Sequence, residues 1–260
     1  MAKKVKKDLG GKIVTEPKKL ISKKEKTVIW ILSVVIALGV IAGVVLGALY
    51  GAGAFEKETP TLHVKSAENG YKKYYVTGGR VPGVYAVMTI TDGTETYDLD
   101  ILLMKDLAPI TVNNFIRYAE DGFYDGTAFH RIVPTTYTFQ GGGFTYEKET
   151  GYKEKKATYD AIRGEFASNP TGEYEYNILS HFAGTISMAR TNDKNSATSQ
   201  FFFSWASYPA WDGDYAAFGF LVDLEDVLVL KRLGENAKTD ENDRPISPIT
   251  ITKVEIIEIK

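Results

Sequence analysis

Four short segments of the chain combine arginine, histidine or glutamine with aromatic side chains. In chain order they read FHRIVP (129–134), QGGGF (140–144), SMAR with SQFFF (187–190 and 199–203) and WDGDYAAFG (211–219). An arginine and amide donors beside aromatic rings can hold an apolar group and donate hydrogen bonds to the polar atoms around it. The chain has no cysteine and only three histidines, of which no two have metal-ligand spacing. We therefore expect chemistry without a thiol, a metal or another cofactor.

Taken together with their separations, these segments resemble the cyclophilin family of peptidyl-prolyl cis-trans isomerases. The resemblance covers roughly residues 84–260 and includes the segment APITVNNF at 108–115. It implies a closed antiparallel β-barrel that binds proline-containing unfolded or extended polypeptides.

The chemistry of such an enzyme agrees with the residue types in these segments. Rotation about an X–Pro bond has a barrier of about 18–20 kcal/mol, because resonance stiffens the C–N bond. A cation or donor near the proline nitrogen, an apolar pocket for the ring and polar groups along the flanking backbone can lower it. None of these tasks needs a nucleophile, and the sequence shows no hydrolase triad or obvious carboxylate pair.

The resemblance implies a role for each matching residue. Arg131 matches the catalytic arginine, and Gln140 matches the glutamine that holds this arginine and the substrate carbonyl. Tyr137 falls where the floor of the proline pocket is expected. The predicted substrate-binding residues are His130, Tyr137, Thr138, Ala189, Arg190, Gln200, Phe202, Ala210, Trp211 and Tyr215.

Phe202 also has an argument of its own, since alternation along a strand sends it to the face opposite Phe201 and Phe203. We interpret Phe202 as a pocket residue and its two neighbours as core.

The chain departs from the family pattern near the expected pocket. The interval from His130 to Gln140 is one residue longer than usual, and Thr138 replaces an apolar residue. Ala210 occupies the place of a tryptophan, for which the adjacent Trp211 offers partial compensation. These departures leave substrate preference and catalytic efficiency open. A non-catalytic proline-peptide-binding chaperone is therefore the alternative function.

Mostly strands are expected to position these residues. Apolar or alternating runs predict strands over Tyr85–Thr91 and Tyr97–Met104, joined by a hairpin at Asp92-Gly93. The last predicted strand changes phase near Lys253, which indicates a bulge. The further predicted strands are Ala128–Val133, Gly184–Arg190, Gln200–Trp205, Ala216–Val222 and Ile249–Ile259.

Two helices are predicted between these strands. In the first, Asp106 is the expected cap, Pro109 suits the first turn and Gly122 ends the helix. The second runs from Asp223 as its cap to about Leu233, followed by Gly234. Many strands with two helices predict a mainly β fold, a closed barrel with two capping helices.

The N-terminal region predicts a membrane anchor ahead of this barrel. Residues 28–50 are 23 residues without a charge, and ten lysines lie in residues 1–27. Such a span suits one transmembrane helix, and its basic flank predicts a cytoplasmic tail and an extracytoplasmic catalytic domain. The small residues 52–54 allow a cleaved signal peptide instead, but the apolar stretch is longer than such a segment needs. We expect a single-pass plasma-membrane protein with a linker over 51–83 before the domain at 84–260.

Charge and glycine spacing bear on its partners. The formal net charge is −2, and about +7 of the balance lies in residues 1–27. The rest of the chain is therefore acidic, which argues against nucleic-acid binding. Gly39, Gly43 and Gly47 fall on one helix face, so a weak homodimer or a membrane-anchored scaffold is a further alternative, although glycine is frequent in membrane helices.

Overall fold

The computed structural model describes residues 59–67, 69–169 and 177–260. Within these ranges the two α-helices are α2 (Pro109–Glu120) and α3 (Leu224–Asn236), and one short 3-10 helix, η1, covers Pro209–Trp211. The strands are β1 (Thr61–Ser66), β2 (Lys72–Thr77), β3 (Gly83–Thr91), β4 (Thr96–Leu103), β5 (Ala128–Phe129), β6 (Arg131–Val133), β7 (Thr138–Gly141), β8 (Phe144–Glu147), β9 (Gly151–Glu154), β10 (Thr185–Met188), β11 (Phe201–Ser204), β12 (Ala217–Leu221) and β13 (Ile249–Ile259).

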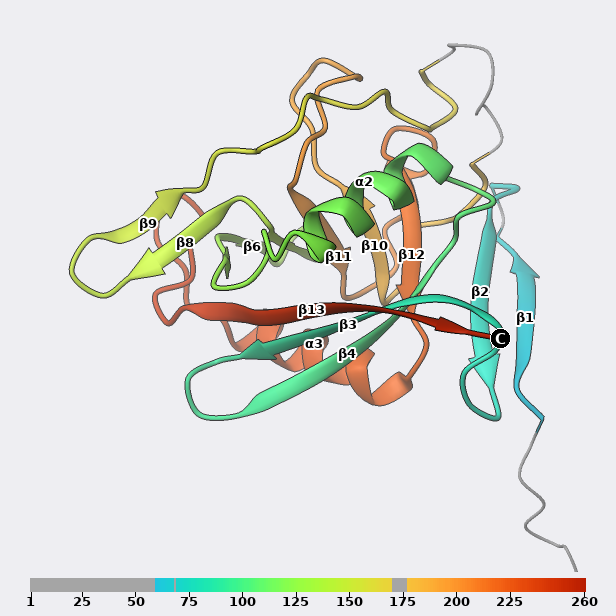
Figure 1. Cartoon of the computed structure of the whole chain (residues 1–260), viewed down its shortest axis with the longest axis horizontal. Coiled ribbons are helices and arrows are strands. Elements are labelled where there is room, and N and C mark those ends of the chain that lie inside the picture. Colours follow the sequence, from blue (N-terminus) through green and yellow to red (C-terminus); the bar gives the residue numbers. More distant parts are fainter. Residues whose placement is uncertain (1–58, 68, 170–176) are drawn as a thin grey trace, which may run out of the picture. The chain divides into compact units, whose positions relative to one another are not determined.

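One antiparallel sheet dominates the described part of the chain. Its nine strands follow the order β5-β13-β3-β4-β12-β10-β11-β7-β6. The end strands β5 and β6 are separated along the chain only by His130, so the sheet curves into a nearly closed barrel (Figure 1). The predicted mainly β barrel with two helices is confirmed, and so is the bulge in β13, where the register shifts between Ile251 and Lys253.

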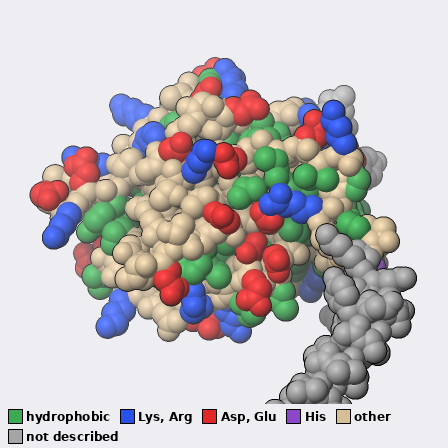
Figure 2. Space-filling view, turned by 60° about the horizontal axis from the view of Figure 1, so that its bottom comes forward, with side chains coloured by type: hydrophobic (Ala, Val, Ile, Leu, Met, Phe, Trp, Pro, Cys, Tyr) green, Lys and Arg blue, Asp and Glu red, His purple; other side chains and the backbone are tan. Residues whose placement is uncertain are grey.

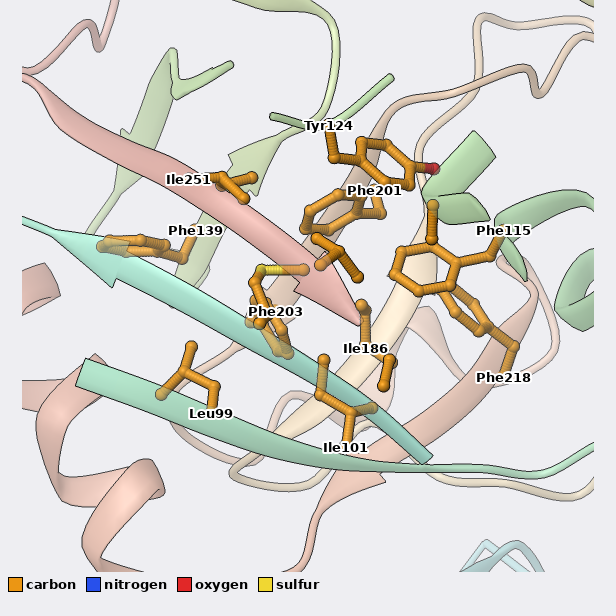
Figure 3. Close-up of a cluster of buried hydrophobic side chains, with 14 of the residues drawn as sticks. Leu99, Ile101, Phe115, Tyr124, Phe139, Ile186, Phe201, Phe203, Phe218 and Ile251 are labelled. Carbon is orange, nitrogen blue, oxygen red and sulfur yellow. The ribbon is translucent and has the colours of Figure 1, made fainter. Parts of the chain in front are cut away.

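The barrel interior is filled by large apolar side chains. Alternate residues of β3 point inward, and Ala86, Met88 and Ile90 are fully buried. Figure 3 shows this core, in which Phe115 of α2 meets the Phe201 ring edge-on at 5.6 Å. The core thus fixes β11 and α2 relative to each other and leaves the opposite face of β11 for other contacts.

The N-terminus of α2 differs from the prediction. The helix begins at Pro109 as expected, but its N-cap is Ala108, which has no capping side chain, and not Asp106. The buried carboxylate of Glu165 accepts the free N–H groups of Ile110 (3.0 Å) and Thr111 (2.7 Å) instead. A cap from a residue distant in sequence cannot be predicted from local spacing.

Helix α3 begins as predicted and ends later. The Asp223 carboxylate accepts the N–H of Glu225 at 3.2 Å, as a capping aspartate does. Gly234, which was expected to lie after the helix, is buried inside it, and the helix continues to Asn236. A Cβ at Gly234 would lie 2.9 Å from the Trp205 ring. Gly234 therefore allows close packing of helix and ring and does not end the helix.

The segment predicted as a linker contains a hairpin. Strands β1 and β2 pair in antiparallel register, from Thr61 opposite Thr77 to Ser66 opposite Lys72. Tyr74 on β2 is buried in a second apolar cluster, where its ring stacks on Phe220 at 6.1 Å. The expectation of a linker over 51–83 is therefore wrong for residues 61–77. The apolar residues Leu62 and Val64 of β1 are exposed, so this strand has no buried face for a sequence pattern to indicate.

The predicted membrane segment 28–50 and its glycines Gly39, Gly43 and Gly47 lie outside the described residues. Among the residues that are described, no helix combines the length and apolarity needed to cross a bilayer. On the face shown in Figure 2, acidic and basic side chains are interspersed. That face therefore offers no continuous basic surface for phosphate groups.

Candidate active site

Most of the predicted site residues meet in one small pocket, here named the Phe202 pocket. It is a hollow of about 100 Å³ lined by Arg131, Thr138, Gln140, Ala189, Arg190, Phe202, Trp211 and Tyr215. Three adjacent strands bring its centre together, because Arg131 on β6 lies opposite Gln140 on β7, which in turn lies opposite Phe202 on β11. One level of the sheet therefore carries a cation, an amide and an aromatic ring side by side.

The wall of the pocket is an aromatic cluster around Phe202. This side chain is 3% exposed, and its ring meets the edges of Trp211 at 4.8 Å and Tyr215 at 5.5 Å. Its strand neighbours Phe201 and Phe203 are fully buried in the barrel core. The predicted alternation along β11 is thus confirmed, and Trp211, not Ala210, supplies the indole at the pocket.

Arg131 provides a half-exposed cation at the pocket rim. Its side chain is 47% exposed, and Nη2 lies 3.3 Å from the Asp243 carboxylate. The backbone carbonyl of Asp243 also accepts the N–H of Ile132 at 2.9 Å, which holds this acidic turn beside β6. An ion pair this exposed contributes only about 0–1 kcal/mol to stability, so the guanidinium can exchange Asp243 for a substrate carbonyl or amide at little cost.

Gln140 joins the Phe202 pocket to a neighbouring hollow. Its Nε2 donates to Oε1 of Gln200 at 3.0 Å, and both side chains line this second hollow of about 170 Å³. No hydrogen bond from Gln140 to the Arg131 side chain is present among the described residues. The glycines after Gln140 allow this part of the chain to lie close to the segment that carries Gln200. A Cβ at Gly142 (φ +79°) would lie 2.8 Å from the Ser199 carbonyl.

Arg190 and Ala189 form the other side of the pocket. The Arg190 guanidinium donates to the Asp214 carbonyl at 2.8 Å and lies 4.6 Å from the centre of the Tyr215 ring. Arg190 is therefore held by a backbone carbonyl and an aromatic ring, whereas the contact given for Arg131 is an exposed ion pair with Asp243. The N–H of Ala189 donates to the Gln200 carbonyl at 2.9 Å.

Four predicted site residues lie outside the Phe202 pocket: Gln200 lines the neighbouring hollow, and His130, Tyr137 and Ala210 line neither hollow. His130 is buried, and its ring packs on Phe144 at 4.2 Å. Burial lowers the pKa of His130 to about 4, so the ring is neutral at pH 7. Tyr137 adopts φ +55° in the turn before β7 and contacts Trp205, which leaves Thr138 to line the pocket. Ala210 is exposed on η1.

A buried polar pair behind the pocket was not predicted. His181 is not among the predicted site residues, but its side chain is fully buried and its Nδ1 lies 3.0 Å from the Asp212 carboxylate. Its ring stacks against Phe202 at 6.0 Å with an 11° angle between the planes, and Nε2 is 3.2 Å from the Ser187 hydroxyl. The one sequence signal for this pair is that Asp212 directly follows the predicted site residue Trp211.

The pocket can hold a small apolar ring and a peptide group without covalent chemistry. Its cation at the rim, amide donors and aromatic wall match the needs of an X–Pro bond in rotation. Within residues 59–67, 69–169 and 177–260, no group of histidines and carboxylates could hold a metal ion.

Comparisons with known proteins agree with this geometry. Residues 86–256 match the family model of cyclophilin type peptidyl-prolyl cis-trans isomerases. The chain is 36% identical over 172 residues to peptidyl-prolyl cis-trans isomerase A of Dickeya dadantii (strain 3937), covering 64% of this chain and 82% of the relative. It is 34% identical over 180 residues to peptidyl-prolyl cis-trans isomerase B of Escherichia coli (strain K12), covering 65% and 99%.

A solved structure shows the same similarity. The crystal structure of a Cryptosporidium parvum cyclophilin type peptidyl-prolyl cis-trans isomerase in the presence of the dipeptide Ala-Pro superposes with a TM-score of 0.52 at 25% identity. The match covers 67% of this chain and 99% of that one.

Proposed function

Since the chain belongs to the cyclophilin family of peptidyl-prolyl cis-trans isomerases, we propose that the Phe202 pocket is its isomerase site and that Arg131 stabilises the twisted amide. The observation that carries this proposal is the position of a half-exposed guanidinium on the same level of the sheet as Phe202. In the twisted state the lone pair is localised on the proline nitrogen, and a nearby N–H donor stabilises this state by a hydrogen bond to the nitrogen.

The other pocket residues then hold the substrate around this nitrogen. The Phe202 ring, flanked by Trp211 and Tyr215, receives the proline ring. Gln140 is fixed by Gln200 and offers its amide to the carbonyl before the proline. The hollow around Gln200 takes the preceding part of the peptide.

Catalysis is tested by the refolding of a protein whose slow step is an X–Pro isomerisation. Uncatalysed isomerisation takes tens to hundreds of seconds, so we expect the full chain at substoichiometric concentration to shorten this phase. A refolding phase of the same protein that is not limited by X–Pro isomerisation serves as the control, and its rate should not change. Peptide binding without any acceleration would instead indicate a non-catalytic chaperone.

We further propose that residues 28–50 anchor the enzyme in the plasma membrane, with residues 1–27 in the cytoplasm and the barrel outside. The support is the uncharged 23-residue span and its lysine-rich flank. Its clients are then secreted or surface proteins, whose proline isomerisation limits folding outside the cell.

Protease accessibility tests this topology. We expect protease added to intact cells without an outer barrier to remove the barrel, while a cytoplasmic marker stays intact. A barrel that is cut only after lysis would contradict the proposed orientation, and a barrel released into the medium would indicate a cleaved signal.

A further inference from the structure

The hairpin of β1 and β2 lies outside the segment that matches the family model, which begins at residue 86. It nevertheless touches both loops that carry the rear of the Phe202 pocket. The N–H of Lys72 donates to the Ile178 carbonyl at 2.6 Å, and the N–H of Ser180 donates to the Lys72 carbonyl at 2.9 Å. The start of β2 is therefore hydrogen-bonded to the chain immediately before His181.

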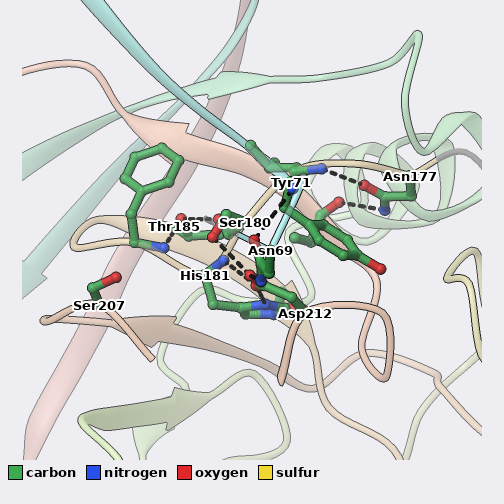
Figure 4. Close-up of polar contacts among 12 residues, drawn as sticks. Asn69, Tyr71, Asn177, Ser180, His181, Thr185, Ser207 and Asp212 are labelled. Carbon is green, nitrogen blue, oxygen red and sulfur yellow. Dashed lines mark hydrogen bonds and ion pairs between the residues drawn. The ribbon is translucent and has the colours of Figure 1, made fainter. Parts of the chain in front are cut away.

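The turn of the hairpin reaches the second loop. Nδ2 of Asn69 donates to Oδ2 of Asp212 at 2.6 Å. Oδ1 of the same side chain accepts the N–H of Tyr71 at 3.2 Å, so the amide is held at both ends. The Tyr71 hydroxyl lies so close to Gly213 that a Cβ there would be 2.5 Å away. Figure 4 shows Asn69 between Tyr71 and Asp212, with which it forms these two hydrogen bonds.

Asp212 is the point where these contacts meet the pocket. Its side chain is 1% exposed and also accepts the Ser180 hydroxyl at 2.8 Å and the His181 N–H at 2.7 Å. Burial raises the pKa of Asp212, but its hydrogen bonds, those from His181 foremost, outweigh burial and hold the pKa below the ordinary value. Asp212 is therefore a buried carboxylate anion that needs each of its donors.

Two residues, His181 and Trp211, connect Asp212 to the substrate site. His181, held by Asp212, stacks against Phe202. Trp211 precedes Asp212 in the chain and contacts both His181 and Phe202, at 6.0 and 4.8 Å between ring centres. A displacement of Asp212 would therefore move the aromatic wall of the pocket.

We propose that the β1–β2 hairpin is a positioning element of the isomerase site, in which Asn69 fixes Asp212 and thereby holds Trp211 and His181 against Phe202. This inference rests on the proposed function of the Phe202 pocket. Neither Asn69 nor the hairpin touches the substrate in this arrangement, so their effect is transmitted through the two loops.

The test compares full-length Asn69→Ala and the double variant Asn69→Ala/Tyr71→Ala with the unchanged protein. We expect kcat/KM for a proline peptide to fall about 5-fold in the single variant and about 20-fold in the double variant, from the loss of about one and two contacts respectively. Asn69 is exposed, so the melting temperature of the single variant should stay within about 2 °C. The matched control is Asn236→Ala, which removes an exposed amide that donates to Arg232 on α3; its kcat/KM should not change.

A second readout separates positioning from general loosening of the fold. A fluorine label on the indole of Trp211 should report a shifted or broadened resonance in both Asn69 variants, whereas the label on buried Trp205 should not respond. Unchanged kcat/KM and an unchanged Trp211 resonance in the double variant would overturn the inference. Absence of isomerase activity in the unchanged protein would instead overturn the proposed function, so the two failures are distinguishable.

Discussion

Replacement of Arg131 by alanine is expected to lower kcat/KM for prolyl isomerisation by about 100-fold, which corresponds to about 3 kcal/mol of transition-state stabilisation. The Phe202 pocket is lined by two arginines, Arg131 and Arg190. The Arg190 guanidinium donates to the backbone carbonyl of Asp214, which leaves the Arg131 guanidinium as the cation for the substrate. Stability should change little, since the Arg131 side chain is 47% exposed and its one ion pair is at the surface. Peptide kinetics and thermal unfolding measure the two effects separately.

Two variants sharpen this test. Arg131→Lys keeps the charge but loses the planar fork of donors, so we expect it to restore little of the activity. Asp243→Asn removes the negative charge beside Arg131 without changing the size of the side chain, and should alter kcat/KM by no more than about 2-fold. If Arg131→Ala and Arg131→Lys both keep normal rates, the arginine has no catalytic role and serves only the ion pair.

Replacement of Phe202 by alanine is expected to lower kcat/KM by about 30-fold or more. The ring is the centre of the aromatic wall, and its loss removes the apolar contact for the proline ring, which contributes about 2 kcal/mol. Because Phe202 is 3% exposed, stability should also fall, by about 3 kcal/mol. Activity must therefore be measured at a temperature where the folded fraction has been determined.

The neighbouring Phe203 provides the matched control. It lies on the same strand, points into the barrel core and is fully buried. Phe203→Leu should lower the melting temperature and leave kcat/KM of the folded protein unchanged. Phe202→Leu, a milder change than Phe202→Ala, should lower kcat/KM of the folded protein. Equal losses of activity in both variants would show that Phe202 acts through stability and does not form a substrate pocket.

The sequence was most informative where neighbouring residues decide the outcome. Alternation along β11 separates Phe202 from the core, and the phase change near Lys253 marks the bulge, because both follow from the two-residue period of a strand. The helix cap at Asp223 is equally local. Arg131, Gln140 and Phe202 meet because the strands that carry them are adjacent in the sheet.

The features that could not be predicted depend on residues distant in sequence. Glu165 caps α2 from more than fifty residues away, and Gly234 belongs to a helix because it packs on Trp205. Tyr137 lies at positive φ in the turn before β7, and its ring packs against Trp205 and not in the lining of the pocket. His181 reads as a polar loop residue until its partner Asp212 is placed beside it.

The pairing of β3 with β13 determines when this domain can fold. Gly83, at the start of the barrel sequence, lies opposite Ile259, the penultimate residue of the chain. Because synthesis proceeds from the N-terminus, β3 can pair at once with β4, but its other edge must wait for β13, and closing so long a loop carries an entropic cost. Until then the apolar residues of β3 have no barrel to enter, as in other chains of high contact order. The barrel can therefore close only after β13 has been synthesised.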